Sequence, residues 1–347
     1  MKVSFRDLIG SLLVLFIFMT VLPVGTFAND QENIGFTVES IQPNTQVDKS
    51  MSLYYFSVEP STQQTIKLKI ISQQKQRKKV SITVTDAITN KNGNIDYGQE
   101  SPDLDESLDD PISSFVKVKK GMETISVENF EEKIIELEVN PPKSKFEGVK
   151  LGAVRIIAED DDSKKGTITN KYGYTIALMI TEDNNDYKTG GDIRLKRVWP
   201  GIEDGKKIVK LPIQNYLPKV IKNVAISGFI TKKDSKRKLT SKEIETADFA
   251  PNSVLPFNIS LGLESLSPGI YTVHVKAKQN ERNWSWKQDF EITEATANKM
   301  NKQATFKLVL LPIIKKLACI LIVAVILVVF LLMIRHKKWK RELRESD

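Results

Sequence analysis

The stretch Thr65–Ile70 reads TIKLKI and places an apolar side chain at every second position. A period of two is that of a β-strand with one buried face. The same alternation recurs at Val80, Ile82 and Val84, at Ile135, Leu137 and Val139, and at Tyr271, Val273 and Val275. Turn residues such as Asn92-Gly93 separate these runs. Because no long amphipathic helix competes, the pattern predicts an all-β chain of antiparallel β-sandwiches.

The charge distribution divides the middle of the chain into two modules. Residues 29–183 carry 19 basic and 26 acidic side chains, a net charge of −7, whereas residues 184–306 carry 21 basic and 13 acidic ones, a net charge of +8. The polar stretch 181–186 lies where the sign changes, and about 280 residues suffice for two domains. We therefore expect two tandem immunoglobulin-like β-sandwiches plus terminal segments.

The N-terminus has the features of a secretory signal. Lys2 and Arg6 precede an apolar run over residues 8–24, and Thr26-Phe27-Ala28 offers small residues for a signal peptidase. The sequence thus predicts a signal peptide over residues 1–28, cut between Ala28 and Asn29. The alternative is an uncleaved N-terminal anchor.

The C-terminus is predicted to cross a membrane once. Residues 317–334 carry no charge, and about 20 apolar helical residues span a bilayer. We expect a transmembrane helix over 310–334 and a cytoplasmic tail over 335–347, because basic residues stay inside. A buried core helix is the alternative, but it does not fit the dense basic tail. No Leu-Pro-x-Thr-Gly signal for covalent wall attachment precedes the helix.

The chain carries little that resembles a catalytic apparatus. It has two histidines and one cysteine, Cys319, so the exported part contains no disulfide. We predict a non-enzymatic protein with no cofactor, no catalytic residue and no metal site. The acidic loops 103–110 and 159–162 leave calcium binding open, although solvated carboxylates are favoured. A wall hydrolase with paired carboxylates is the enzyme alternative, and a purely structural scaffold is the other. Nucleic-acid binding is not expected, because the basic runs lie between strands.

Several strings in a fixed order resemble the WxL-interacting protein (WxLIP) family of Gram-positive bacteria. In the first module these strings are Phe36-Thr37-Val38, the stretch 89–97 (TNKNGNIDY), Pro141-Pro142, Phe146-Glu147-Gly148 and the stretch 170–174 (NKYGY). In the second module they are the stretch 250–253 (APNS), Leu266 with Gly269 and Tyr271, and Trp284 with Phe290. The resemblance runs from about residue 34 to the basic tail. Asn215-Tyr216-Leu217-Pro218 and Trp286 depart slightly from the family pattern.

The resemblance implies a binding role at the cell surface. Residues 34–158 would form a peptidoglycan-binding domain, which a strand at 170–181 would complete, and residues 163–302 a host-binding domain with its core at about 190–293. The implied partners are a WxL-domain surface protein, peptidoglycan and host extracellular matrix proteins. None of the four tryptophans begins Trp-x-Leu, so the chain is expected to be the interacting protein and not a WxL protein. The expected location is the cell membrane, with a single pass and the modules in the cell-wall zone.

A contact patch can be nominated from aromatic side chains beside polar groups. The candidates are Asp96 and Tyr97 in one turn and the tyrosines Tyr172 and Tyr174, because an aromatic ring can stack on sugar or anchor a protein interface. The alternative is that Asp96 closes a hairpin and the tyrosines pack in the core.

Overall fold

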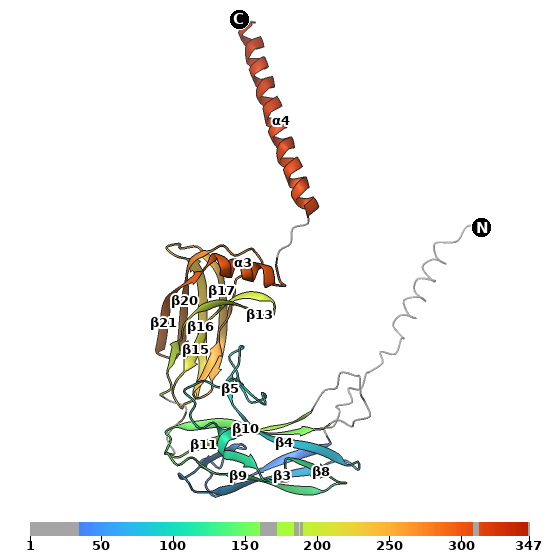
Figure 1. The fold of residues 1–347 in the computed structure, drawn as a ribbon, viewed down its shortest axis with the longest axis vertical. Helices are drawn as coiled ribbons and strands as arrows, with labels where there is room; N and C mark the ends of the chain where they lie inside the picture. Colours follow the sequence, from blue (N-terminus) through green and yellow to red (C-terminus); the bar gives the residue numbers. More distant parts are fainter. Residues whose placement is uncertain (1–34, 160–171, 184–186, 188–189, 308–311, 346–347) are drawn as a thin grey trace, which may run out of the picture.

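The computed structural model describes residues 35–159, 172–183, 187, 190–307 and 312–345 (Figure 1). The predicted signal peptide and its cut between Ala28 and Asn29 lie outside these residues. Strands dominate the described chain and helices are few, so the prediction of an all-β protein is confirmed.

The first module consists of two facing sheets. One sheet has the order β1-β3-β9-β7 and the other β2-β11-β10-β4-β8. Its elements are β1 (Phe36–Ile41), β2 (Tyr54–Ser57), β3 (Gln64–Ser72), β4 (Lys78–Asp86), β5 (Ile88–Thr89), β6 (Ile95–Asp96), α2 (Ile112–Phe115), β7 (Val116–Val118), β8 (Thr124–Val127), β9 (Glu132–Val139), β10 (Val149–Ala158) and β11 (Gly173–Thr181). Strand β11 pairs with β10 along nine residues and with β2 on its other side.

The core of the first module follows from the alternation along its strands. Ile66, Leu68 and Ile70 of β3 are buried and pack in one cluster with Val80 and Ile82 of β4 in the facing sheet. Strand β10 differs because both of its faces are covered. Its even-numbered side chains from Val154 to Ala158 enter this core, whereas Val149 and Leu151 lie on the outer face of the sheet in a separate cluster. That outer face adjoins the second module.

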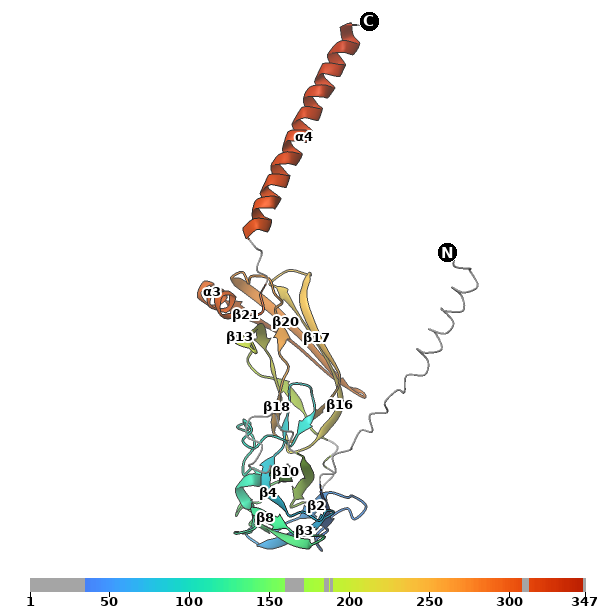
Figure 2. The same cartoon turned by 90° about the vertical axis from the view of Figure 1, so that its right-hand side faces the viewer.

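The second module is also built from packed sheets. Its elements are β12 (Ile193–Leu195), β13 (Trp199–Glu203), β14 (Lys206–Lys210), β15 (Pro212–Asn215), β16 (Ile221–Lys232), β17 (Lys238–Phe249), β18 (Ser253–Pro256), β19 (Ile259–Ser260), β20 (Gly269–Gln279) and β21 (Arg282–Ile292). The long strands form a sheet of order β17-β16-β20-β21, and the short ones form two sheets of order β12-β15-β18 and β13-β14-β19. Figures 1 and 2 show the second module above the first, with its long strands running away from the junction.

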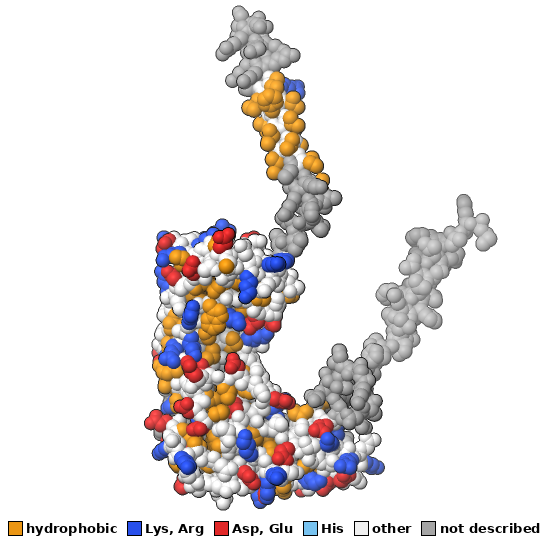
Figure 3. Space-filling model, in the orientation of Figure 1, with side chains coloured by type: hydrophobic (Ala, Val, Ile, Leu, Met, Phe, Trp, Pro, Cys, Tyr) orange, Lys and Arg blue, Asp and Glu red, His pale blue; other side chains and the backbone are white. Residues whose placement is uncertain are grey.

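Two helices follow the second module. Helix α3 (Glu294–Gln303) begins at its N-cap Thr293, whose hydroxyl accepts a hydrogen bond from the Thr296 amide at 3.2 Å, and it buries Ala297 and Met300. Helix α4 (Pro312–Glu345) presents apolar side chains on its surface (Figure 3). Within the part of the chain that the structure describes, no helix has the combined length and apolar character needed to cross a membrane.

Candidate binding site at the junction of the modules

A hairpin formed by β5 and β6 reaches from the first module onto the second. The Thr89 hydroxyl lies 2.6 Å from the Ser253 hydroxyl and accepts a hydrogen bond from the Ala250 amide at 2.9 Å. At the tip, the Asp248 amide donates to the Gly93 carbonyl at 2.7 Å. These contacts join residues more than 150 positions apart, so the hairpin acts as a clamp between the modules.

An apolar cluster lies beneath the hairpin. Its buried members from the first module are Tyr55, Ala87, Val149, Leu151 and Met179, and those from the second are Tyr187, Val220 and Ala250. The rings of Tyr55 and Tyr187 meet edge to face with their centroids 5.2 Å apart. Burial of apolar surface favours the docked state at roughly 25 cal/mol per Å², so this cluster holds the two sandwiches together as one body.

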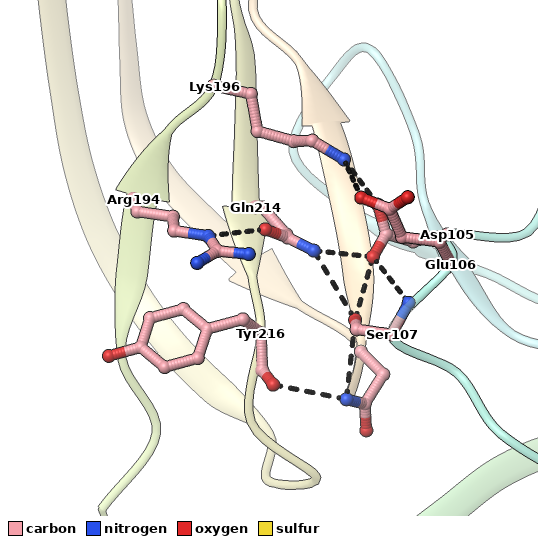
Figure 4. A network of polar contacts seen from close by, with 8 residues as sticks. Asp105, Glu106, Ser107, Arg194, Lys196, Gln214 and Tyr216 are labelled. Atoms are coloured by element: carbon pink, nitrogen blue, oxygen red, sulfur yellow. Dashed lines mark hydrogen bonds and ion pairs between the residues drawn. The ribbon is translucent and has the colours of Figure 1, made fainter.

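A polar network closes the other side of the junction (Figure 4). Asp105 of the first module, whose side chain is 4% exposed, accepts hydrogen bonds from Gln214 Nε2 at 2.5 Å and from Lys196 Nζ at 3.2 Å. The hydroxyl and amide of Ser107 donate to the same carboxylate. Burial alone raises the pKa of Asp105, but the hydrogen bonds from Ser107, Gln214 and Lys196 outweigh it and leave the pKa below its usual value.

A cavity of about 470 Å³ opens between the hairpin and the Asp105 loop. Its lining combines carboxylates and amides with a few apolar side chains, among them Asp96, Asp103, Leu104, Glu203 and Asn252. Such walls suit a polar ligand that donates hydrogen bonds, for example hydroxyl or ammonium groups. Among the described residues, no group of three His, Cys, Asp or Glu side chains could hold a metal ion.

The structure separates the two halves of the predicted contact patch. Asp96 accepts a hydrogen bond from the Gly98 amide at 2.7 Å and lines the cavity, and Tyr97 packs against the apolar cluster at the junction. Tyr174 lies on the opposite face of the β10 sheet, inside the first core, where its ring meets Phe36 at 5.5 Å. Tyr172 is 40% exposed. The binding role of these four residues stays a prediction, but they do not form one patch.

The sequence alone did not identify the residues that join the acidic loop to the second module. The sequence predicts solvated carboxylates or a calcium ligand set in loop 103–110, yet the Asp105 side chain is buried against Lys196 and Gln214. Lys150, also from the first module, is buried and donates to the Asp109 carbonyl, which fixes the far end of the same loop. No local pattern at Lys196 or Gln214 signals this pairing, because the partners are about 90 and 109 residues apart.

The chain is therefore a two-module all-β protein whose sandwiches are clamped together around a polar cavity. The model of the WxL Interacting Protein peptidoglycan binding domain matches residues 36–158, and that of the WxL Interacting Protein host binding domain matches residues 163–302. The protein belongs to the WxL Interacting Protein family, as its sequence strings predicted.

Comparison with individual proteins adds little to the family assignment. No curated protein matches the chain significantly. Among solved structures, the class 5 fimbriae chaperone CfaA is 11% identical, with 73% of this chain and 98% of that chain covered and a TM-score of 0.29. The E. coli chaperone DraB is 13% identical, with 74% and 98% covered and a TM-score of 0.28. The Pseudomonas aeruginosa CupB2 chaperone is 10% identical, with 65% and 91% covered and a TM-score of 0.26.

Proposed function

We propose that this protein is a non-enzymatic surface adaptor that binds peptidoglycan and a WxL-domain protein, and that also binds host extracellular matrix. The observation that carries the proposal is the tandem of a peptidoglycan-binding and a host-binding family domain in one chain. The clamped junction supports it, because a rigid connection fixes the distance between a wall-bound module and a partner-bound module. We place the first module at 34–158 together with the strand at 170–181, and the second at 163–302 with its core at about 190–293.

We also propose that the chain is exported and held by one membrane span over residues 310–334, with the tail 335–347 in the cytoplasm. Support comes from the uncharged run 317–334 in the sequence, whose described large apolar side chains, from Ile320 to Ile334, are all exposed. Exposed apolar surface of this extent is unfavourable in water and favourable in lipid. Membrane fractionation of cells that produce the full chain tests this proposal, and recovery of the chain after a carbonate wash only in the soluble fraction would contradict it.

Co-sedimentation tests the adaptor function directly. The purified full chain should pellet with insoluble peptidoglycan and should retain a WxL-domain protein in the same pellet. A chain that pellets with neither would leave only the scaffold alternative. Loss of turbidity of purified cell walls in the presence of the chain would instead support the hydrolase alternative.

A further inference from the structure

A cluster of aromatic and cationic side chains surrounds Asp192 on one side of the second module. The Asp192 carboxylate accepts hydrogen bonds from the Tyr216 hydroxyl at 2.6 Å and from Trp284 Nε1 at 2.7 Å. The guanidinium of Arg282 lies 4.7 Å from the Trp284 ring centre, and that of Arg194 lies 5.0 Å from the Tyr216 ring centre. Each ring is thus oriented by Asp192 and covered by an arginine.

This composition is that of a protein-binding hot spot. Trp, Tyr and Arg are enriched among the residues that contribute most of the binding energy at protein interfaces. Side chains that are held in place before binding lose less entropy when a partner binds. The carboxyl of Asp192 remains ionised, because the hydrogen bonds from Tyr216 and Trp284 outweigh the effect of burial and keep its pKa below the usual value. Arg282 forms an ion pair with Asp192 at 3.4 Å, whereas Arg194 Nε donates a hydrogen bond to Gln214 Oε1 at 2.7 Å. The two arginines and the one carboxylate give the cluster an excess of one positive charge.

Among the described residues, the cluster lies where the edge strands of two sheets meet. Strand β12 ends the sheet β12-β15-β18, and β21 ends the sheet β17-β16-β20-β21. Within the described residues, β21 has a ladder partner on one side only, so its outer side leaves backbone N–H and C=O groups unpaired. Trp284 and Trp286 of β21 are half-buried at this open seam and pack against the second core.

The edge at β21 is more regular than the opposite edge of the same sheet. Strand β21 pairs with β20 over eleven residues without a register shift and contains no proline or glycine. Strand β17, at the other edge, shows register shifts at three points along β16. Because bulges prevent another strand from pairing and a straight edge permits it, β21 is the edge suited to strand addition.

We propose that an extended segment of a partner protein pairs with the free edge of β21, and that a carboxylate in this segment binds Arg194 and Arg282. The backbone ladder supplies affinity, and apolar side chains of the segment cover Trp284 and Trp286. The excess positive charge selects an acidic residue next to the apolar ones, because a guanidinium binds a carboxylate with two parallel hydrogen bonds. Through Gln214, Arg194 connects to Asp105 of the junction network (Figure 4). The proposed strand pairing does not depend on the adaptor function.

Selection from a displayed library of random twelve-residue peptides on the purified full chain tests the proposal. We expect enriched peptides with alternating apolar residues and an Asp or Glu. Their affinity should fall at least tenfold in the double variant Arg194→Glu with Arg282→Glu. The milder double variant Arg194→Gln with Arg282→Gln, which keeps polar side chains, should also weaken binding if the first variant does not fold. The matched control is Lys236→Glu with Lys299→Glu, which changes the charge equally at two exposed lysines outside β12 and β21.

Amide hydrogen exchange then separates strand addition from other modes of binding. A bound peptide should protect amides of β21 and leave those of β17 unchanged. Equal affinity for the wild type and both arginine variants, protection elsewhere, or no enrichment on the wild type would overturn the proposal.

Polyphosphate is the second probe, because it is anionic but has no peptide backbone. Arginine-dependent binding of polyphosphate without any selected peptide would likewise overturn it.

Discussion

Gly93 shows how one residue without a side chain permits the modules to dock. Its φ is +81°, a region that L side chains rarely adopt, and an added Cβ would lie 2.9 Å from the Ala247 Cβ of the second module. Gly93→Ala should therefore lower the free energy of unfolding by about 1–3 kcal/mol or more, measured by urea denaturation. Gly121→Ala is the control, because Gly121 has a φ of +88° but open space around it. Equal losses in both variants would contradict a role of Gly93 in docking.

Asp105 contributes to the junction through its charge. Asp105→Asn removes the ion pair with Lys196 and places an amide N–H₂ group against the donors of Gln214 or Lys196, so we expect a loss of about 1–3 kcal/mol at pH 7. Glu106→Gln is the control. The Glu106 side chain is 80% exposed although it too lies 3.1 Å from Lys196, and exposed ion pairs contribute little.

The pH dependence of that loss has a definite sign. The folded pKa of Asp105 is depressed, so its stabilisation is present above the pKa of the unfolded chain and is lost as the pH falls through the folded pKa. The difference in unfolding free energy between the wild type and Asp105→Asn should therefore shrink as the pH is lowered from 7 to below 4. A difference that stays constant over this range would show that Asp105 acts through shape and not through charge.

At the scale of elements, the buried hydroxyl of Thr89 helps to hold the hairpin of β5 and β6 on the second module. Thr89→Val keeps the side-chain shape but leaves the buried Ala250 amide without its acceptor, so the free energy of unfolding should fall by about 1–3 kcal/mol. Thr240→Val is matched to it, since the Thr240 hydroxyl donates to the Ser260 carbonyl in an exposed position and its loss should cost less. Thermal or urea denaturation measures the free energy of unfolding of both variants. A larger loss for Thr240→Val than for Thr89→Val would contradict the role of the hairpin as a clamp between the modules.

The sequence predicts those strands in which apolar and polar side chains alternate along the chain. The period of two at Thr65–Ile70 predicts β3, because burial of one face depends only on neighbours two positions apart. Asn92-Gly93 likewise predicts a turn, and the Gly93 amide does donate to the Asn90 carbonyl at 2.9 Å. What the turn touches could not be predicted. Its contacts with Ala247 and Asp248 depend on how two complete sandwiches dock, and no local period encodes that arrangement.

The candidate site was predicted only in part for the same reason. Asp96 does line the cavity, but Asp105, Lys196 and Gln214 carry no sequence signal that links them. Tyr97 and Tyr174 look equivalent in sequence, as aromatic residues in polar surroundings. Tyr174 of β11 lies in the first core, whereas Tyr97, which follows β6, packs against the cluster on the opposite face of the β10 sheet.

At the scale of the whole molecule, the cluster beneath the hairpin should make the two modules unfold together. Two domains unfold separately when few contacts join them. The interface between these two modules combines an apolar cluster, a hairpin and a buried ion pair. We expect a single calorimetric transition at pH 7. Two separate transitions for the wild type at that pH would contradict cooperative unfolding.

Tyr97 makes this coupling sensitive to alkaline pH. Burial, with the nearby Asp248 carboxylate and Tyr187, raises the pKa of Tyr97 to about 12. The unfolded chain ionises near pH 10, so the stabilisation is complete below pH 10 and is lost between pH 10 and 12, at about 1.4 kcal/mol per pH unit. Tyr97→Phe keeps the ring and removes the ionising hydroxyl. The variant should therefore lose less stability than the wild type between pH 9 and 11.5, while other buried tyrosines affect both proteins equally.

Because Tyr97 lies between the modules, its ionisation in the wild type should also split the single transition into two, and the variant should retain one. Identical alkaline profiles of the two proteins would mean that Tyr97 reaches solvent without separating the modules.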